Sequence, residues 1–232
     1  MPNIADNLAT VQERIAAACN RAERAPEDVQ LVAVGKKFPA PIIREAAEAG
    51  LTVFGENRVQ EAKAKISDCP GHLRWHFIGN LQTNKCRDAV ALFDFLHAVD
   101  SLHLAAELNK RCEQAAKVMP VLLEVNVSGE ASKHGFTPEA TVAAMDAFSD
   151  FPQLELHGLM TMAPFSRHPE SARPYFQKLR ELKNACEDQL GAPLPELSMG
   201  MSGDYEIAIE EGATLIRLGT TLFGPRAAAN KN

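Results

Sequence analysis

The stretch LVAVGKKFPAP (31–41) contains a complete change from strand to loop to helix. Its first half, LVAVG (31–35), is short, apolar and bounded by glycine, which is typical of a fully buried strand. Pro39 and Pro41 mark a loop, and a helical pattern then covers residues 40–49. The same strand-then-helix unit recurs along the chain, so this stretch represents the repeating element of the fold.

Eight such units follow one another in about 200 residues. The expected strands are residues 31–35, 51–54, 75–78, 95–99, 121–127, 155–160, 196–199 and 214–218. The expected helices are residues 3–24 before the first strand, then 40–49, 57–67, 82–92, 101–117, 138–149, 170–190 and 204–211, with a last turn near 220–228. Eight β-then-α units predict an α/β fold, a parallel (β/α)₈ TIM barrel with an extra N-terminal helix. The alternative is an open doubly wound sheet, and the count of eight favours the barrel.

Composition fits one soluble domain spanning residues 1–232. The chain is 46% hydrophobic and 23% charged, and it shows no linker or low-complexity segment. The net charge of -6 has no block of like charge, which argues against nucleic acid or an anionic membrane as a partner. The last residues, AAANKN (227–232), are expected to fray.

The five cysteines predict free thiols in a reducing cytoplasm. They are odd in number and widely spaced, without a CxxC pair, so neither a disulfide framework nor a metal site is expected. The N-terminal segment lacks the basic start and apolar core of a secretory signal, and no stretch approaches transmembrane length. We therefore expect a cytoplasmic location.

Lys36 is the first candidate for chemistry, because it directly follows the first apolar strand. At the mouth of a sheet, beside apolar walls, an ammonium is poorly solvated and the neutral amine is favoured. A neutral amine can condense with an aldehyde. The alternative is an ordinary solvated loop lysine, which residue type alone would favour.

Two glycine-containing loops indicate a phosphate site. Phosphate in barrels often binds after strands seven and eight. Strand seven leads into SMGMSGDYE (198–206), where Ser202 and Gly203 precede a helical pattern, and strand eight leads into Gly219 and Thr220. Backbone N–H groups and a serine hydroxyl at such loops bind anions. The alternative for the first loop is a plain helix cap by Ser202 or Asp204.

Arg217 lies within the eighth strand, between Ile216 and Leu218. If these apolar neighbours face the helices, Arg217 points into the barrel. A buried arginine needs a partner, which is either a ligand or an inward carboxylate such as Glu124. Facing a pyridine nitrogen, Arg217 could only donate, and it would leave that nitrogen unprotonated and the ring a weak electron sink.

Three further features lie around the expected mouth of the barrel. Asn57 follows the second strand and either donates to a ligand ring oxygen or, like Glu56, caps a helix. His76 in the third strand faces either the ligand or the core. The irregular segment TMAPFSRHPESARP (161–174) is long enough to serve as a lid.

Together these segments resemble the pyridoxal phosphate homeostasis proteins, which are single-domain barrels similar to the N-terminal domain of alanine racemase. The resemblance covers nearly the whole chain and keeps the family's order. It rests on VAVGKKFPA (32–40), FGENRVQE (54–61), WHFIGNLQTNK (75–85), SKHGF (132–136), GLMTMAP (158–164), LSMGMSGDYEIAIEEGAT (197–214) and IRLGTTLFG (216–224).

The resemblance implies pyridoxal 5'-phosphate as the cofactor. It implies that Lys36 carries this cofactor as an internal aldimine and that Arg217 meets the pyridine nitrogen. It also implies a set of residues that hold the phosphate: Ser202, Gly203, Gly219 and Thr220.

The function that follows is a cofactor carrier. The protein would hold reactive pyridoxal phosphate and pass it to apo forms of pyridoxal-phosphate enzymes, with no catalytic residues of its own. We expect a monomer, although the sequence does not determine the oligomeric state.

Two enzyme functions are the alternatives. An amino-acid racemase needs a second base opposite the lysine. The chain has two tyrosines, of which Tyr175 is expected on an outer helix and Tyr205 beside the phosphate loop. The chain also ends soon after its expected barrel. A Schiff-base aldolase would also use a lysine and a phosphate pocket, but its lysine commonly lies on a later strand, and such a protein is colourless whereas a pyridoxal aldimine is yellow.

Overall fold

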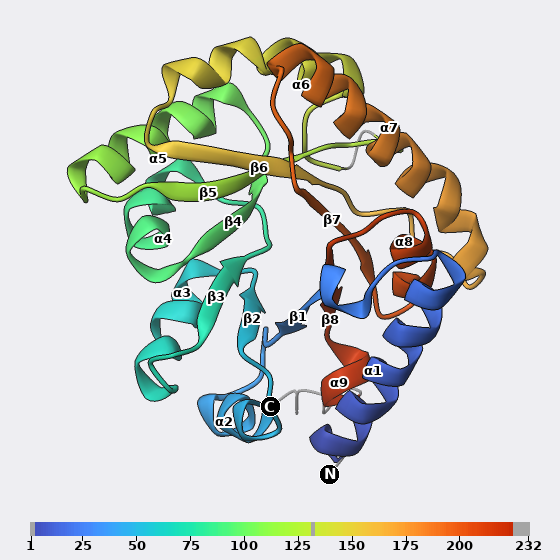
Figure 1. The fold of residues 1–232 in the computed structure, drawn as a ribbon. Helices are drawn as coiled ribbons and strands as arrows, with labels where there is room; N and C mark the ends of the chain where they lie inside the picture. Colours follow the sequence, from blue (N-terminus) through green and yellow to red (C-terminus); the bar gives the residue numbers. More distant parts are fainter. Residues whose placement is uncertain (1–2, 131–132, 225–232) are drawn as a thin grey trace.

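Eight parallel strands close into a barrel in the order β1 to β8, with β8 paired back to β1 (Figure 1). A computed structural model provides this structure and describes residues 3–130 and 133–224. The strands are β1 Gln30–Val34, β2 Val53–Glu56, β3 Arg74–Phe77, β4 Phe95–Val99, β5 Met119–Glu124, β6 Leu154–Met160, β7 Glu196–Met201 and β8 Leu215–Leu218. All eight predicted strands are present, and the predicted barrel is confirmed.

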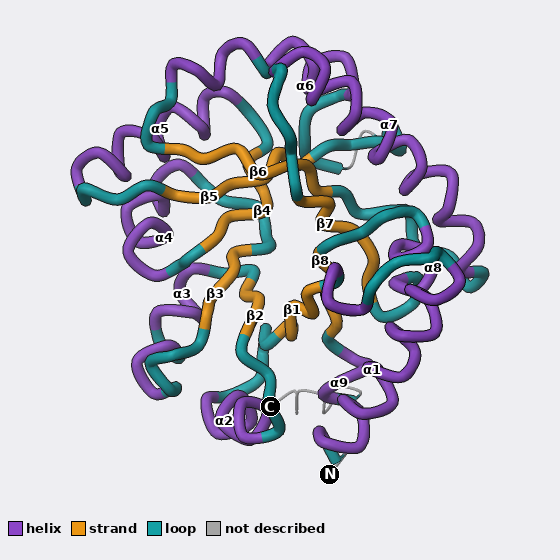
Figure 2. The backbone as a smooth tube through the Cα atoms, in the orientation of Figure 1, coloured by secondary structure: helices purple, strands orange, loops and turns teal. Residues whose placement is uncertain are grey.

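Helices surround the strands, as Figure 2 shows in purple around orange. They are α1 Ile4–Arg21, α2 Ala40–Glu48, α3 Val59–Lys63, α4 Cys86–Leu92, α5 Leu102–Gln114, α6 Pro138–Ala144, α7 Arg173–Leu190, α8 Tyr205–Glu210 and α9 Thr220–Phe223. Short 3₁₀ turns complete the shell: Pro26–Asp28, Ile66–Asp68, Thr83–Lys85, Asp146–Asp150 and Pro169–Ala172.

Three sequence predictions need correction. The helix expected over 57–67 is broken into α3 and the turn Ile66–Asp68, and the helix expected over 138–149 ends at Ala144 before another turn. The irregular segment expected over 161–174 is shorter, because a 3₁₀ turn begins at Pro169. The expected fraying of residues 227–232 lies outside the described residues.

Two apolar layers hold the barrel together. The larger layer lies between the strands and the helices and contains Ala33, Phe54, Ile216 and Leu218 among its strand residues. The smaller layer contains only strand residues and fills the barrel interior: Val32, Val53, Phe95, Ala98, Leu122, Met160 and Leu215. Since side chains alternate along a strand, this division tells which face each neighbouring residue occupies.

The extra helix α1 packs against α8 and α9, the helices that follow β7 and β8 (Figure 1). Its apolar stripe of Ile4, Leu8, Val11 and Ile15 is buried. Asn7 donates to the Leu222 carbonyl over 2.8 Å, which ties α1 to α9. The N-terminal helix therefore supports the two loops that the sequence predicts to bind phosphate.

None of the helices in residues 3–130 and 133–224 is long and apolar enough to cross a membrane. All five cysteines are free thiols, and four of them are buried. Burial raises the pKa of the Cys86 thiol to about 12, so this side chain is neutral at physiological pH.

Candidate functional site

Lys36 lies just beyond the carboxyl end of β1, next to the last strand of the barrel. Val32 is paired with Arg217 across the β1–β8 contact. A Cβ atom on Gly219 would lie only 3.6 Å from the Val34 Cβ, so the loop after β8 begins against the end of β1. Lys36 is half-buried, whereas the neighbouring Lys37 is exposed. The loop that contains Lys36 and the loop that begins at Gly219 therefore lie side by side at the carboxyl end of the barrel.

The loops after β7 and β8 meet through the Ser202 hydroxyl. The backbone N–H groups of Gly219 and Thr221 both donate to Ser202 Oγ, over 3.4 Å in each case. These are long hydrogen bonds. A Cβ on Gly203 would meet no atom within 4 Å, so the chain is open to solvent at that point. The sequence predicted that these two loops would meet, and the structure places them together.

The alternative role of Ser202 or Asp204 as a helix cap is not what the structure shows. Asp204 occupies the N-cap position of α8, but no side chain there accepts a capping hydrogen bond. Asp204 Oδ1 instead accepts from the Met201 N–H over 2.6 Å and so closes the loop on itself. Burial raises the pKa of Asp204, while that hydrogen bond and the Arg217 charge act to lower it.

Arg217 points into the barrel, as the sequence predicts from its apolar neighbours. Its guanidinium donates to Ser198 Oγ over 2.6 Å and to the Thr161 carbonyl over 2.9 Å. Within the described residues it makes no ion pair with Glu124, which was the alternative. Burial lowers the pKa of Arg217 to about 10, and Asp204 and then Glu124 oppose this shift. Arg217 is thus a cation at neutral pH inside an apolar barrel.

A chain of hydrogen bonds extends from Arg217 across the barrel interior. Nδ1 of His97 lies 2.9 Å from Ser198 Oγ, and Nε2 of His97 lies 3.0 Å from Nδ1 of His76. Arg217 can only donate, so Ser198 Oγ accepts from it, and the tautomers of the two histidines set which atom donates in each of the other two contacts. His76 therefore faces the barrel interior, where Phe95 packs against its ring.

His76 and His97, the two histidines in this series of hydrogen bonds, are neutral at physiological pH. Burial lowers the pKa of His76 to about 3, with a smaller contribution from the Arg74 charge. Burial also lowers the pKa of His97 well below its ordinary value, and the proximity of His76 and Arg217 adds to the shift. The two histidines that extend the hydrogen bonding from Arg217 therefore add no positive charge to the one that Arg217 carries.

Asn57 sits after β2, held by close backbone packing. A Cβ on Gly79 would come within 2.5 Å of the Asn57 carbonyl oxygen and 2.8 Å of its Cα. Only glycine at position 79 allows this approach. Neither Glu56 nor Asn57 caps α3, whose N-cap residue is Arg58. Glu56 is instead fully buried and pairs with Lys65.

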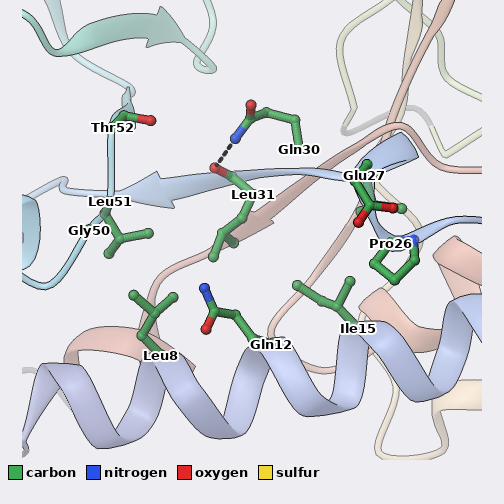
Figure 3. A pocket seen from close by; sticks show the side chains of 11 residues that line it. Leu8, Gln12, Ile15, Pro26, Glu27, Gln30, Leu31, Gly50, Leu51 and Thr52 are labelled. Atoms are coloured by element: carbon green, nitrogen blue, oxygen red, sulfur yellow. Dashed lines mark hydrogen bonds between the residues drawn. The ribbon is translucent and has the colours of Figure 1, made fainter.

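A second feature that resembles a ligand site lies at the opposite end of β1. A crevice of about 320 Å³ runs between α1 and the amino ends of β1 and β2 (Figure 3). Figure 3 shows Leu8, Gln12 and Ile15 of α1 facing Leu31 across it. Ligands of such barrels bind at the carboxyl ends of the strands. We therefore assign the candidate site to the end of the barrel that carries Lys36.

Sequence reasoning missed the residues that hold Arg217. Ser198 is a buried hydroxyl inside an apolar strand, and Thr161 contributes only a backbone carbonyl. His97, in the strand FLHAV (95–99), is a lone polar residue among apolar ones. A polar residue at an inward position of a strand was the available signal, and His76 and His97 both carried it.

Comparison with known proteins agrees with this picture. The family model for the alanine racemase N-terminal domain matches residues 6–227. A pyridoxal phosphate homeostasis protein of Aquifex aeolicus is 44% identical over 97% of this chain and 99% of its own length. One from Pseudomonas aeruginosa is 45% identical over 97% of both chains.

A solved structure of PipY from Synechococcus elongatus, with pyridoxal phosphate bound, superposes with a TM-score of 0.83. It is 40% identical to this chain and covers 95% of it, and the alignment includes 100% of that protein. The identity and coverage are high enough to establish a shared family, and not the fold alone.

The buried histidine chain predicts a specific loss of stability in acid. Because the folded pKa of His76 lies below its unfolded value of 6.5, its stabilising contribution is present above pH 6.5 and is lost as the pH falls toward 3. Between pH 7 and pH 4.5 we expect a loss on the order of 2–3 kcal/mol from this residue. Urea unfolding across this range measures it.

The substitution H76Q should reduce this pH dependence, because glutamine keeps a hydrogen-bonding group beside His97 but does not titrate, while His97 keeps its own contribution. The control is H103Q, at an exposed position on α5, which should follow the wild-type curve. Equal pH dependence in H76Q and the wild type would contradict the role assigned to His76.

Proposed function

The chain belongs to the alanine racemase N-terminal domain family and, within it, to the pyridoxal phosphate homeostasis proteins. From this premise we propose that it binds pyridoxal 5'-phosphate through a Schiff base with Lys36 and supplies the cofactor to apo-enzymes. The observation that carries the proposal is that β7, β8 and β1 are neighbours, so that the loops carrying Ser202, Gly219 and Lys36 follow adjacent strands at one end of the barrel. The cofactor's aldehyde condenses reversibly with an amine, and this reversibility allows the cofactor to be handed on.

The donors at this end of the barrel suit each part of that cofactor. The phosphate would be held by the hydroxyls of Ser202 and Thr220 and by backbone N–H groups of Gly203, Gly219 and Thr220. The long hydrogen bond from the Gly219 N–H to Ser202 Oγ supports this, because a phosphate oxygen is a stronger acceptor for the same N–H group. Arg217 would donate to the ring nitrogen, with Ser198 and the Thr161 carbonyl fixing its plane.

Asn57 and His76 complete the proposed cofactor site. Asn57 would donate to a ring oxygen near the Schiff base, from the position that Gly79 fixes. His76 would act from a distance, through His97 and Ser198, by keeping the environment of Arg217 neutral and ordered. No residue of this chain is assigned a catalytic role.

Two features of the site favour a carrier over a racemase. Arg217 stays protonated at pH 7 and offers only N–H donors, so the ring nitrogen would remain unprotonated and the ring would be a weak electron sink. The other feature is the placement of the tyrosines. Tyr205 on α8 and Tyr175 on α7 both belong to the layer outside the strands, so neither faces Lys36 as a second base.

The proposed site needs only one copy of the chain. Its cofactor-binding residues all come from the loops and strands of a single barrel. We therefore include in the proposal that the protein acts as a monomer, and that it works in the cytoplasm, where its five free thiols would remain reduced.

The first test is the identity of the lysine. Borohydride reduction of the protein with pyridoxal phosphate, followed by peptide mass mapping, should place the adduct on Lys36. Lys37 has a positive φ of 69° and an exposed side chain, so it points away from its neighbour. The variant K37G should give the same adduct yield as the wild type, and an adduct mainly on Lys37 or Lys85 would refute the assignment.

The phosphate loops predict a difference between two ligands. S202A and T220V should each weaken binding of pyridoxal phosphate about tenfold while leaving binding of pyridoxal nearly unchanged. A hydrogen bond to a charged acceptor contributes roughly 1.5–3 kcal/mol, which sets this magnitude. Spectroscopic titration with each ligand measures it. The control is S149A, at an exposed position in the turn Asp146–Asp150. Equal losses for both ligands would show that Ser202 and Thr220 do not contact the phosphate.

The carrier function predicts transfer without turnover. The loaded protein should restore activity to an apo form of a pyridoxal-phosphate enzyme, and the cofactor-free K36A variant should not. Incubation with L-amino acids should give no α-proton exchange above that of free pyridoxal phosphate. Rapid, saturable exchange that disappears in K36A would contradict the carrier function and support the racemase.

A further inference from the structure

Lys65 contacts the Gly35–Lys36 peptide bond from the outer side of the barrel wall. Its Nζ donates to the Gly35 carbonyl over 2.8 Å and to Glu56 Oε1 over 2.5 Å. Both ionic side chains are buried, with exposed fractions of 7% for Lys65 and 0% for Glu56. We infer that Lys65 is a positioning residue that holds the Gly35–Lys36 peptide in place for the amine of Lys36.

We call the contact of Lys65 with the Gly35 carbonyl the clamp. The clamp and the candidate site lie on opposite sides of the barrel wall. Phe54 belongs to the outer layer, so Glu56, two residues later on β2, also faces outward. On β1, Val32 faces inward and Ala33 faces outward. Gly35 continues the outward series, and Lys36 continues the inward one. Lys65 therefore cannot contact a ligand inside the barrel, and it acts on Lys36 only through the backbone.

The turn that carries Lys36 needs such support. The Phe38 N–H donates to the Gly35 carbonyl over 3.0 Å, which closes a four-residue turn. Lys37, third in this turn, has a φ of 69°. Glycine or asparagine usually stands where a turn requires a positive φ, and a lysine there is strained. The Lys37 N–H donates to Glu61 Oε2 over 3.2 Å, and the Lys65 contact fixes the other end of the turn.

Gly35 is the residue that lets the clamp close. Its N–H donates to the Gly55 carbonyl over 3.0 Å, which extends the sheet past the end of β1. A Cβ at this position would lie 2.8 Å from Ile43 Cδ1 and 3.0 Å from Glu56 Oε1. A larger residue would require the side chain of Ile43 or of Glu56 to shift. The Gly35 carbonyl thus accepts two donors beside a position that leaves little room for a side chain.

Stability alone is a poor reason for this ion pair. Taking both charges out of water offsets most of their mutual attraction, so a buried pair adds little net stability. Within the described residues, Oε2 of Glu56 has no hydrogen-bond partner. Burial raises the pKa of Glu56, whereas Lys65 and, more weakly, Glu56's neighbour Lys36 act to lower it. A costly pair directly behind Lys36 is better explained by its contact with the Gly35 carbonyl.

The test separates the clamp from the ion pair and rests on the proposed function only where a ligand is used. The double variant E56Q/K65M removes both charges and the donor to Gly35, so no charge is left buried alone. The single variant E56Q keeps Lys65 as a donor to Gly35. K63M, at an exposed position on α3, is the matched lysine control.

Two readouts are needed. Hydrogen exchange of cofactor-free protein reports on the peptide that covers residues 34–39. The rate of borohydride-trapped adduct formation with pyridoxal reports on Lys36 without any contribution from the phosphate loops. In folded E56Q/K65M we expect faster exchange in this peptide and adduct formation about tenfold slower, because a small displacement of a reacting group has effects of this size. E56Q and K63M should match the wild type in both.

Several outcomes would overturn the inference. Wild-type exchange and wild-type adduct rate in folded E56Q/K65M would show that Lys65 positions nothing. A tenfold loss in folded E56Q would assign the effect to the ion pair instead, and this variant decides the question if the double variant does not fold. If the wild type itself forms no adduct, the proposed function fails, and the exchange readout still tests the clamp.

Discussion

The parallel pairing of β8 with β1 is the contact on which the candidate site depends. Lys36 comes early in the chain, whereas Arg217, Gly219 and Thr220 come near its end. Only closure of the barrel brings these segments together, with Val32 opposite Arg217 and Ala33 opposite Leu218. The loop after β7 joins them through Ser202. The candidate site is therefore assembled from segments near both ends of the sequence, and α1 packs outside it on α8 and α9.

The barrel interior is built around one buried cation. A guanidinium without an ion-pair partner among the described residues is costly to bury, and neutral acceptors offset this cost. Ser198 and the Thr161 carbonyl accept from Arg217, and two histidines that burial keeps neutral extend the hydrogen bonding. This arrangement keeps Arg217 a donor with a fixed direction. Outside the wall, the buried Lys65 differs in having a carboxylate partner, since it donates both to Glu56 and to the Gly35 carbonyl.

The sequence predicted the barrel because its strands are short apolar runs separated by helical patterns. It also predicted the inward direction of Arg217, since alternation along a strand is a local property. It could not predict which polar groups Arg217 contacts, because Ser198 and Thr161 come from other strands and other loops. The sequence suggests a helix-capping role for Glu56 and gives no sign that Glu56 pairs with Lys65. Their pairing depends on how α3 packs against β2, which residue spacing alone does not reveal.

The central claim is that Lys36, the Ser202 loop and Arg217 form one site for one molecule of pyridoxal phosphate. A crystal structure of this protein with the cofactor tests it most directly. The account predicts electron density continuous with Lys36 Nζ, a phosphate in contact with Ser202 and the Gly219–Thr220 backbone, and a ring nitrogen facing Arg217. Density for the phosphate elsewhere, such as in the crevice between α1 and β1, or a ring nitrogen turned away from Arg217, would contradict it.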